Sequence, residues 1–524
     1  MAEPIWPDWL TLWFTERTLY LQLTMEGLFP CLVGTVLLIV ALLKMKLLLN
    51  RTRTKGYLPP SPPKLPIIGN LHQLGKMPHI SLCKIAQKLG PMMFLQLGEV
   101  PTVVISSAAM AKKVMKTHDL AFSSRPQLYS AKWLFYNCTN IVFSPYGAYW
   151  RHVRKICILE LLSTKRVQSY GFIREEEVSR LLRRIADSCS KPINLSKLLG
   201  LYANDVLCRA VLGRNFSEGG DYDMHGFQSM LEEYQELLGG FSIGDFFPSK
   251  EFVHLLTGHK RRLQNTFKRF DNFFEQVVRE HLDPERNNEG EKDILDFLLE
   301  IQKNGSSEMP LTLDNVKAIL LDMFAAGTDT SFIVLDWGMT ELIMNPKIMK
   351  KAQAEIRRLV GERQVVLEND LPKLHYLKAV IKEIFRLHPP VPVLVPRESI
   401  QDVTIEGYNI PAKTRVFINV WAIGRDPESW KNPETFDPER FVGSTIDFKG
   451  QDFELLPFGA GRRGCPGITF GAVTVELALA QLLHSFDWKL PPGVEAKDLD
   501  LTEAFGISMP KTSDLIVVAK PCFA

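Results

Sequence analysis

The chain has 524 residues, 46% of them hydrophobic and 23% charged, which is ordinary for a globular protein with a large buried core. A formal net charge of +3 is too small to indicate nucleic-acid binding. The eight cysteines include no C-x-x-C pair, so the spacings of zinc and thioredoxin sites are excluded, and the pattern fits a reducing compartment.

An apolar run near the N-terminus predicts a membrane anchor. Residues 28–49 come close to the ~20 apolar residues that span a bilayer. Basic residues follow this run instead of preceding it, which is the reverse of a cleaved signal peptide and places the rest of the chain in the cytosol. We therefore predict a single-pass signal anchor, against the alternative of a buried core helix. Residues 1–27 are predicted to be a lumenal tail, unless Met25 is the native start.

A basic and proline-rich segment at 50–70 follows the anchor. Its second half reads PPSPPKLPIIGN, which favours a stiff, extended hinge over the alternative of a ligand for a proline-binding domain. From 71 to 524 there is no second linker and no repeat. Amphipathic periodicity predicts helices around 145–162, 172–187, 260–282 and 312–345, and strand-like pieces occur at 91–106, at 402–419 and near 487 and 515. This pattern predicts one mainly helical domain with small peripheral sheets.

Two helices carry polar residues in suggestive positions. Trp150 and Arg154 are four residues apart and can face one partner, although such a pair is usually an ordinary cation–π contact. The predicted helix 312–345 carries Ala-Gly-Thr-Asp-Thr-Ser at 326–331, and these are mostly weak helix formers. Small residues there would leave a groove along the helix. The alternative is a helix break, but apolar periodicity continues through Leu342.

The segment Pro457–Gly467 carries the sharpest signal. Its glycines match G-x-G-x-x-G, but a dinucleotide fingerprint opens a βαβ unit and needs an acidic residue after a second strand, which this chain lacks. A thiolate ligand explains the segment better. Glycines let the backbone approach a flat cofactor, a helix predicted to begin at Pro466 stabilises the Cys465 thiolate, and Arg463 can reach a cofactor carboxylate.

The same residues match F-x-x-G-x-R-x-C-x-G at every fixed position, and this segment resembles the haem-binding signature of the cytochrome P450 family. The resemblance extends from the anchor to the last strands and is strongest to the plant microsomal 71 clan (A-type). It implies the P450 fold, a mainly α helical prism around haem with small peripheral β-sheets. Residues 71–524 would then form the cytosolic haem-thiolate catalytic domain.

The resemblance also implies a role for individual residues. Cys465 would be the axial ligand of haem b iron, and Asp329 with Thr330 would relay protons to oxygen. Glu383, Arg386 and Arg440 would form a buried structural triad, although the first two alone suggest only a surface ion pair. The expected cofactor-binding residues are Trp150, Arg154, Ala326, Arg397, Phe458, Arg463 and Gly467.

The implied reaction is monooxygenation at the endoplasmic reticulum membrane. NADPH–cytochrome P450 reductase, itself a flavoprotein, would supply electrons, with cytochrome b5 as a further candidate partner and Arg151 and Lys155 as candidate docking residues. The substrate would be a small apolar plant metabolite (a terpenoid, phenylpropanoid or alkaloid precursor). The segments expected to line its pocket are Tyr129–Asn140, Met323–Ala326, Val391–Val395, Phe505 and Ile507.

Two other functions are weighed against this one. A haem-thiolate isomerase or dehydratase needs no reductase, but such enzymes commonly lack the acid–threonine pair that this chain has. A non-catalytic membrane-tethered binding protein would not need the cysteine loop and the polar helix segment together.

Overall fold

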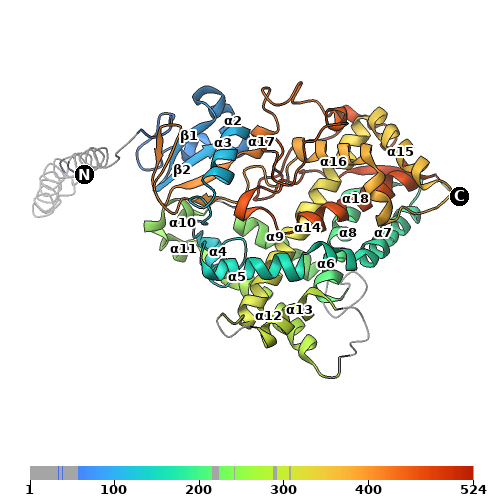
Figure 1. Ribbon diagram of the computed structural model, residues 1–524, viewed down its shortest axis with the longest axis horizontal. Coiled ribbons are helices and arrows are strands. Elements are labelled where there is room, and N and C mark those ends of the chain that lie inside the picture. Colours follow the sequence, from blue (N-terminus) through green and yellow to red (C-terminus); the bar gives the residue numbers. More distant parts are fainter. Residues whose placement is uncertain are drawn as a thin grey trace, which may run out of the picture. The chain divides into compact units, whose positions relative to one another are not determined.

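The computed structural model describes residues 57–214, 224–240, 242–286, 292–305 and 309–522, together with Gly34 and Leu38. The chain divides into a small unit, Met1–Leu58 with Glu406–Asn409, and a large unit, Pro59–Ile405 with Ile410–Ala524. Every predicted site residue belongs to the large unit. Figure 1 labels helices and strands of this unit.

Helices dominate the described residues. They are α2 (Pro78–Leu89), α3 (Ala108–Lys112), α4 (Tyr129–Leu134), α5 (Ala148–Ile156), α6 (Thr164–Ser169), α7 (Gly171–Ala186), α8 (Leu195–Leu212), α9 (Met224–Gly239), α10 (Ile243–Phe246), α11 (Val253–Leu256), α12 (His259–Leu282), α13 (Ile294–Asn304), α14 (Leu313–Met344), α15 (Pro346–Val360), α16 (His375–Leu387), α17 (Val420–Ile423) and α18 (Ile468–Ser485). The four helices predicted from periodicity are confirmed, in α5 with the π-helical turn that follows it, α7, α12 and α14.

The strands are short and lie in small sheets. They are β1 (Met92–Leu97), β2 (Val100–Ile105), β3 (Pro192–Asn194), β4 (Arg397–Glu398), β5 (Val403–Ile405), β6 (Tyr408–Ile410), β7 (Arg415–Ile418), β8 (Phe486–Lys489) and β9 (Ile516–Pro521). One sheet has the order β1-β2-β7-β4, in which β2 and β7 are parallel and the other neighbours antiparallel. A second, antiparallel sheet has the order β3-β9-β8. The predicted strand regions are therefore confirmed.

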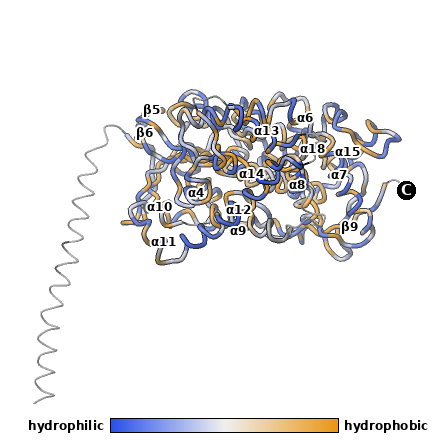
Figure 2. Tube along the Cα trace, turned by 90° about the horizontal axis from the view of Figure 1, so that it is seen from below, coloured by the Kyte–Doolittle hydropathy of each residue, from blue (hydrophilic) through white to orange (hydrophobic). Residues whose placement is uncertain are grey.

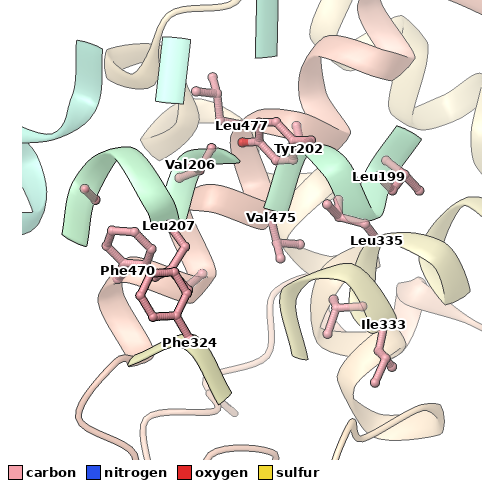
Figure 3. Close-up of a cluster of buried hydrophobic side chains, with 14 of the residues drawn as sticks. Leu199, Tyr202, Val206, Leu207, Phe324, Ile333, Leu335, Phe470, Val475 and Leu477 are labelled. Carbon is pink, nitrogen blue, oxygen red and sulfur yellow. The ribbon is translucent and has the colours of Figure 1, made fainter. Parts of the chain in front are cut away.

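The core is built around α14, which packs most extensively on α8 and also contacts α18. Figure 3 shows the apolar side chains of these three helices meeting, among them Leu207 of α8, Phe324 of α14 and Phe470 of α18. A capping box of Thr312 and Asn315 starts α14. Figure 2 shows apolar stretches gathered in the interior around this helix. A helix that is apolar on most of its surface is buried on most sides, so α14 is a core helix.

Two described helices, α14 and α18, are long and apolar enough to cross a membrane, but both are mostly buried in the protein and are core helices. The predicted anchor at 28–49 lies outside the described residues apart from Gly34 and Leu38.

The second half of the proline-rich segment packs against β1. The Phe94 N–H donates to the Pro60 carbonyl at 2.9 Å, and the Asn70 N–H donates to the Gln96 carbonyl at 2.6 Å. Asn70 is fully buried, and its Oδ1 accepts from the Gln96 N–H at 2.8 Å. Residues 59–70 are thus part of the large unit.

Candidate active site

The cysteine loop is a closed turn that ends at the N-terminus of α18. The Cys465 N–H donates to the Phe458 carbonyl at 2.9 Å, which closes the loop. Gly461 has a φ of +67°, and a Cβ there would collide with the Met115 carbonyl and lie 2.5 Å from Asp119 Oδ1. Only glycine fits this position, because any side chain would both strain the left-handed backbone and meet those atoms.

The structure corrects the predicted start of the following helix. α18 begins at Ile468 with Gly467 as its N-cap residue, not at Pro466. Because proline has no N–H, Gly467 supplies the N–H group that donates to the Cys465 sulfur. Burial raises the pKa of the Cys465 thiol, and the Gly467 N–H and Arg154 oppose this rise in part. The N–H donor and the nearby cation are the two groups here that stabilise the thiolate that a metal-ligating sulfur requires.

Four arginines gather beside the cysteine loop: Arg125, Arg154, Arg397 and Arg463. Arg154 donates to the Gly464 carbonyl, next to the cysteine, and Arg397 Nη2 donates to the Ala460 carbonyl at 2.6 Å. Three of the four were predicted as cofactor-binding residues, and the structure brings them together.

Positive charge exceeds negative charge in this cluster. Burial, followed by repulsion from Arg397 and Arg154, lowers the pKa of Arg463 to about 9. Burial and then repulsion from Arg463 and Arg397 hold the pKa of Arg125 well below its usual range. Asp119 contacts the cluster, with its Oδ1 3.0 Å from Arg397 Nη1. A ligand with two carboxylates would balance the remaining charge and accept the forked N–H donors.

Trp150 lies within this cluster. Its ring centroid is 4.1 Å from the guanidinium carbon of Arg463 and 5.9 Å from that of Arg154. Its Nε1–H donates to the Ile141 carbonyl at 3.0 Å. The predicted spacing therefore does place Trp150 and Arg154 against one partner, which here is the loop that carries Cys465.

The small residues of α14 leave open space inside the core. The helix runs unbroken through this segment, so the alternative of a helix break is wrong. Ala326 is exposed although most of α14 is buried. A Cβ on Gly327 would come within 3.0 Å of Leu207, so α8 packs directly on the backbone there. Thr330 Oγ1 donates to the Ala326 carbonyl at 2.6 Å, and this hydrogen bond is exposed.

Asp329 has an environment suited to proton exchange near neutral pH. Desolvation raises its pKa to about 6, opposed by a hydrogen bond from Gln235 of α9 and reinforced by the charge of Glu232. A carboxyl group with such a pKa holds and releases a proton readily at cytosolic pH.

The predicted buried triad is confirmed. Arg386 donates to both Glu383 oxygens, at 2.7 and 2.8 Å, and Arg440 Nε donates to Glu383 Oε1 at 3.0 Å. The Glu383 and Arg386 side chains are fully buried. Arg386 Nη2 also donates to the Thr435 carbonyl at 3.1 Å, so the triad fastens the segment before Arg440 to α16.

Sequence reasoning missed Arg125 and Asp119. Arg125 Nε donates to the Val142 carbonyl at 3.0 Å, and its Nη1 donates to the Pro396 carbonyl at 2.9 Å. The available signal was weak: one arginine between two serines and a proline. Its partners lie far away in the sequence.

The segment predicted to line the substrate pocket from Tyr129 to Asn140 contains α4. A cavity of about 500 Å³ opens beside it, lined by Tyr129, Lys132, Trp133, Asn137, Glu251, Phe252 and Lys260. None of the predicted cofactor residues lines this cavity, so it is distinct from the arginine cluster and the cysteine loop.

A partly buried cysteine at a helix N-terminus, beside open space in the core and four arginines that outnumber their one carboxylate, fits the iron and the two propionates of haem. The fold and the site together define a haem-thiolate protein. The model of the family described as "Cytochrome P450" matches residues 59–518, and the chain belongs to this family.

Known proteins match this chain along nearly its whole length. The chain is 70% identical to Cytochrome P450 71AP13 of Prunus mume over 93% of this chain and 95% of that protein. It is 46% identical to premnaspirodiene oxygenase of Hyoscyamus muticus over 94% of this chain and 98% of that protein. A solved zebra fish cytochrome P450 with abiraterone superposes with a TM-score of 0.73 at 25% identity, covering 86% of this chain and 100% of that one.

These likenesses assign the reaction class. The protein is a plant 71-type P450 monooxygenase whose cofactor is haem with an axial thiolate. Members of this family receive electrons from a redox partner and act on small hydrophobic substrates.

Proposed function

We propose that Cys465 is the axial ligand and that the arginine cluster holds the haem carboxylates. The supporting observation is the Gly467 N–H on the Cys465 sulfur, together with four arginines that face one carboxylate, that of Asp119. Ala326, Phe458 and Gly467 would lie against the macrocycle, where small or flat side chains allow close approach. Haem bound there supplies the activation of dioxygen by two electrons.

The residues of α14 would deliver protons at the open side of the core. Thr330 keeps its hydroxyl at a fixed place because it donates to the Ala326 carbonyl. Asp329, with its pKa raised to about 6 by desolvation, would exchange protons with solvent and pass them toward that hydroxyl. Each turnover consumes two protons and releases one water, so proton delivery requires a group that is readily reprotonated at neutral pH.

The electrons would come from NADPH through cytochrome P450 reductase, with cytochrome b5 as a second donor. Arg151 and Lys155 on α5 are exposed, and Arg154 of the same helix contacts the cysteine loop through Gly464. An acidic partner docked on α5 would therefore sit near the cofactor.

The protein would be held on the endoplasmic reticulum membrane by a single helix at 28–49, with residues 59–524 in the cytosol. The basic residues after the apolar run support this orientation. The substrate would be a small apolar plant metabolite, and a terpenoid, phenylpropanoid or alkaloid precursor fits the apolar lining of Met323–Ala326 and Val391–Val395.

The axial assignment is tested by Cys465→Ser. The variant should lose the red-shifted Soret band of the reduced carbon monoxide complex, because a serine hydroxyl does not replace a thiolate. Cys157→Ser, which alters the fully buried cysteine that begins the π-helical turn after α5, is the matched control and should keep the band. A surviving band in the Cys465 variant would refute the assignment.

A further inference from the structure

A buried carboxylate on α14 lies outside the machinery described so far. Asp322, two turns before Asp329, is 4% exposed, and none of the described lysines, arginines or histidines forms an ion pair with it. Three N–H donors meet it instead. Asn140 Nδ2 donates to Oδ1 at 2.6 Å, and the N–H groups of Ile141 and Val142 donate to Oδ2 at 2.6 and 3.3 Å.

The other side of the same backbone holds the arginine cluster. The peptide group between Ile141 and Val142 donates its N–H to Asp322, while its carbonyl accepts from Arg463 Nη1 at 3.3 Å and from Trp150 Nε1 at 3.0 Å. In a trans peptide these two groups point in opposite directions. The peptide dipole therefore has its positive end toward the carboxylate and its negative end toward the guanidinium.

A second path of the same kind reaches Arg125. Arg125 Nε donates to the Val142 carbonyl at 3.0 Å, and the N–H of that peptide group, on Phe143, donates to Asn140 Oδ1 at 3.2 Å. The amide of Asn140 in turn donates to Asp322. Two arginines of the cluster are thus linked to one buried carboxyl group through one short stretch of chain.

We propose that Asp322 is a positioning residue for the cofactor-binding arginines. Through its hydrogen bonds to the segment Asn140–Phe143 it fixes the backbone groups that orient Arg463 and Arg125. The inference rests on the proposed function, in which these arginines bind the haem carboxylates. Asn140 is also the last residue of the predicted substrate segment Tyr129–Asn140. Asp322 therefore contacts both that segment and the backbone that holds the cofactor-binding arginines.

Haem retention by the holoenzyme tests the proposal. Asp322→Asn puts an amide donor among N–H donors, so the segment shifts and the arginines lose their alignment. Asp336→Asn is the matched control, because Asp336 is a buried carboxylate on the same helix whose partners are Ser196 and Lys511. Both variants should unfold at a lower temperature. Well below that temperature, haem transfer to excess apomyoglobin should accelerate about tenfold or more in Asp322→Asn, and less than about twofold in Asp336→Asn.

Arg463→Gln separates failure of this inference from failure of the proposed function. It should accelerate haem transfer by itself, and Asp322→Asn should then add less than about twofold, because the two substitutions act on one path. Equal haem transfer rates in Asp322→Asn and Asp336→Asn would overturn the inference alone. Wild-type retention in Arg463→Gln would overturn the arginine assignment and the inference with it.

A milder variant covers the case in which Asp322→Asn does not fold. Asn140→Ala keeps the Asp322 carboxylate and its two backbone donors but removes the link to Phe143 and Arg125. It should accelerate haem transfer in the same direction by a smaller factor. An unchanged rate in this variant would count against the role of the segment.

Discussion

The triad of Glu383, Arg386 and Arg440 allows a quantitative test of buried against exposed charge within one protein. In Glu383→Gln the anion disappears, while Arg386 stays fully buried with its positive charge. Removing one partner of a buried ion pair costs about 3–5 kcal/mol, since the remaining charge is left uncompensated. Glu439→Gln is the matched control, because Glu439 pairs with Lys351 at 2.5 Å and both side chains are about half exposed. An exposed pair contributes at most about 1 kcal/mol.

The assay is thermal unfolding of the holoenzyme, followed by circular dichroism and by loss of the Soret band. With an unfolding entropy of roughly 2 cal/mol/K per residue, a body of this size loses about 1 °C for each kcal/mol. Glu383→Gln should therefore lower the Tm by about 3–5 °C, and Glu439→Gln by less than about 1 °C. Equal shifts in the two variants would refute the reasoning, because burial would then have no bearing on the energy of the pair.

Three further results are expected. Burial raises the pKa of Asp329 from 3.8 to about 6, so its contribution to the free energy of unfolding is complete below pH 3.8 and is lost as the pH rises through 6. This decrease in the free energy of unfolding between pH 4 and pH 8 is on the order of 2–3 kcal/mol, and urea titrations at the two pH values should show that Asp329→Asn abolishes it. An unchanged pH dependence in the variant would show that the pKa of Asp329 is not raised. Thr330→Val should raise the NADPH consumed per product several-fold while the haem spectrum stays unchanged. Ser331→Ala is the control, because the Ser331 hydroxyl also donates to a helix carbonyl, and it should leave this ratio unchanged. Equal effects of the two variants would show that Thr330 has no special role in proton delivery. Gly461→Ala should destabilise the protein by at least about 2 kcal/mol in the same titrations, because its Cβ would meet the Met115 carbonyl at a left-handed backbone position. A urea midpoint equal to that of the wild type would show that the loop changes its conformation to admit the methyl group.

Local patterns predicted most of the architecture. The amphipathic helices were found because periodicity is a property of neighbouring residues, and α14 kept its register through the weak helix formers at 326–331 because its packing on α8 outweighs their propensity. The start of α18 was misplaced by two residues, since sequence alone does not show that the Gly467 N–H turns to the sulfur.

The site was predictable where its residues share one segment and hidden where they do not. Cys465, Arg463 and Gly467 lie in one loop and share one motif. Arg125 and Asp322, by contrast, act on residues that are distant in the sequence. Neither the Ser-Ser-Arg-Pro segment nor a single aspartate in an apolar stretch carries a mark of its partner. The acceptor of the Trp150 N–H was equally unpredictable, because periodicity assigns a face but no hydrogen bond.

The contact of the proline-rich segment with β1 determines where the chain can be shortened. A soluble form cut at residue 71 would remove the carbonyl of Pro60 and the whole of Asn70, leaving the N–H groups of Phe94 and Gln96 without their partners along an open strand edge. Unpaired strand edges recruit other chains. A cut just before Pro59 keeps this edge covered, so two truncations that differ by a dozen residues should yield a monomer in one case and aggregates in the other.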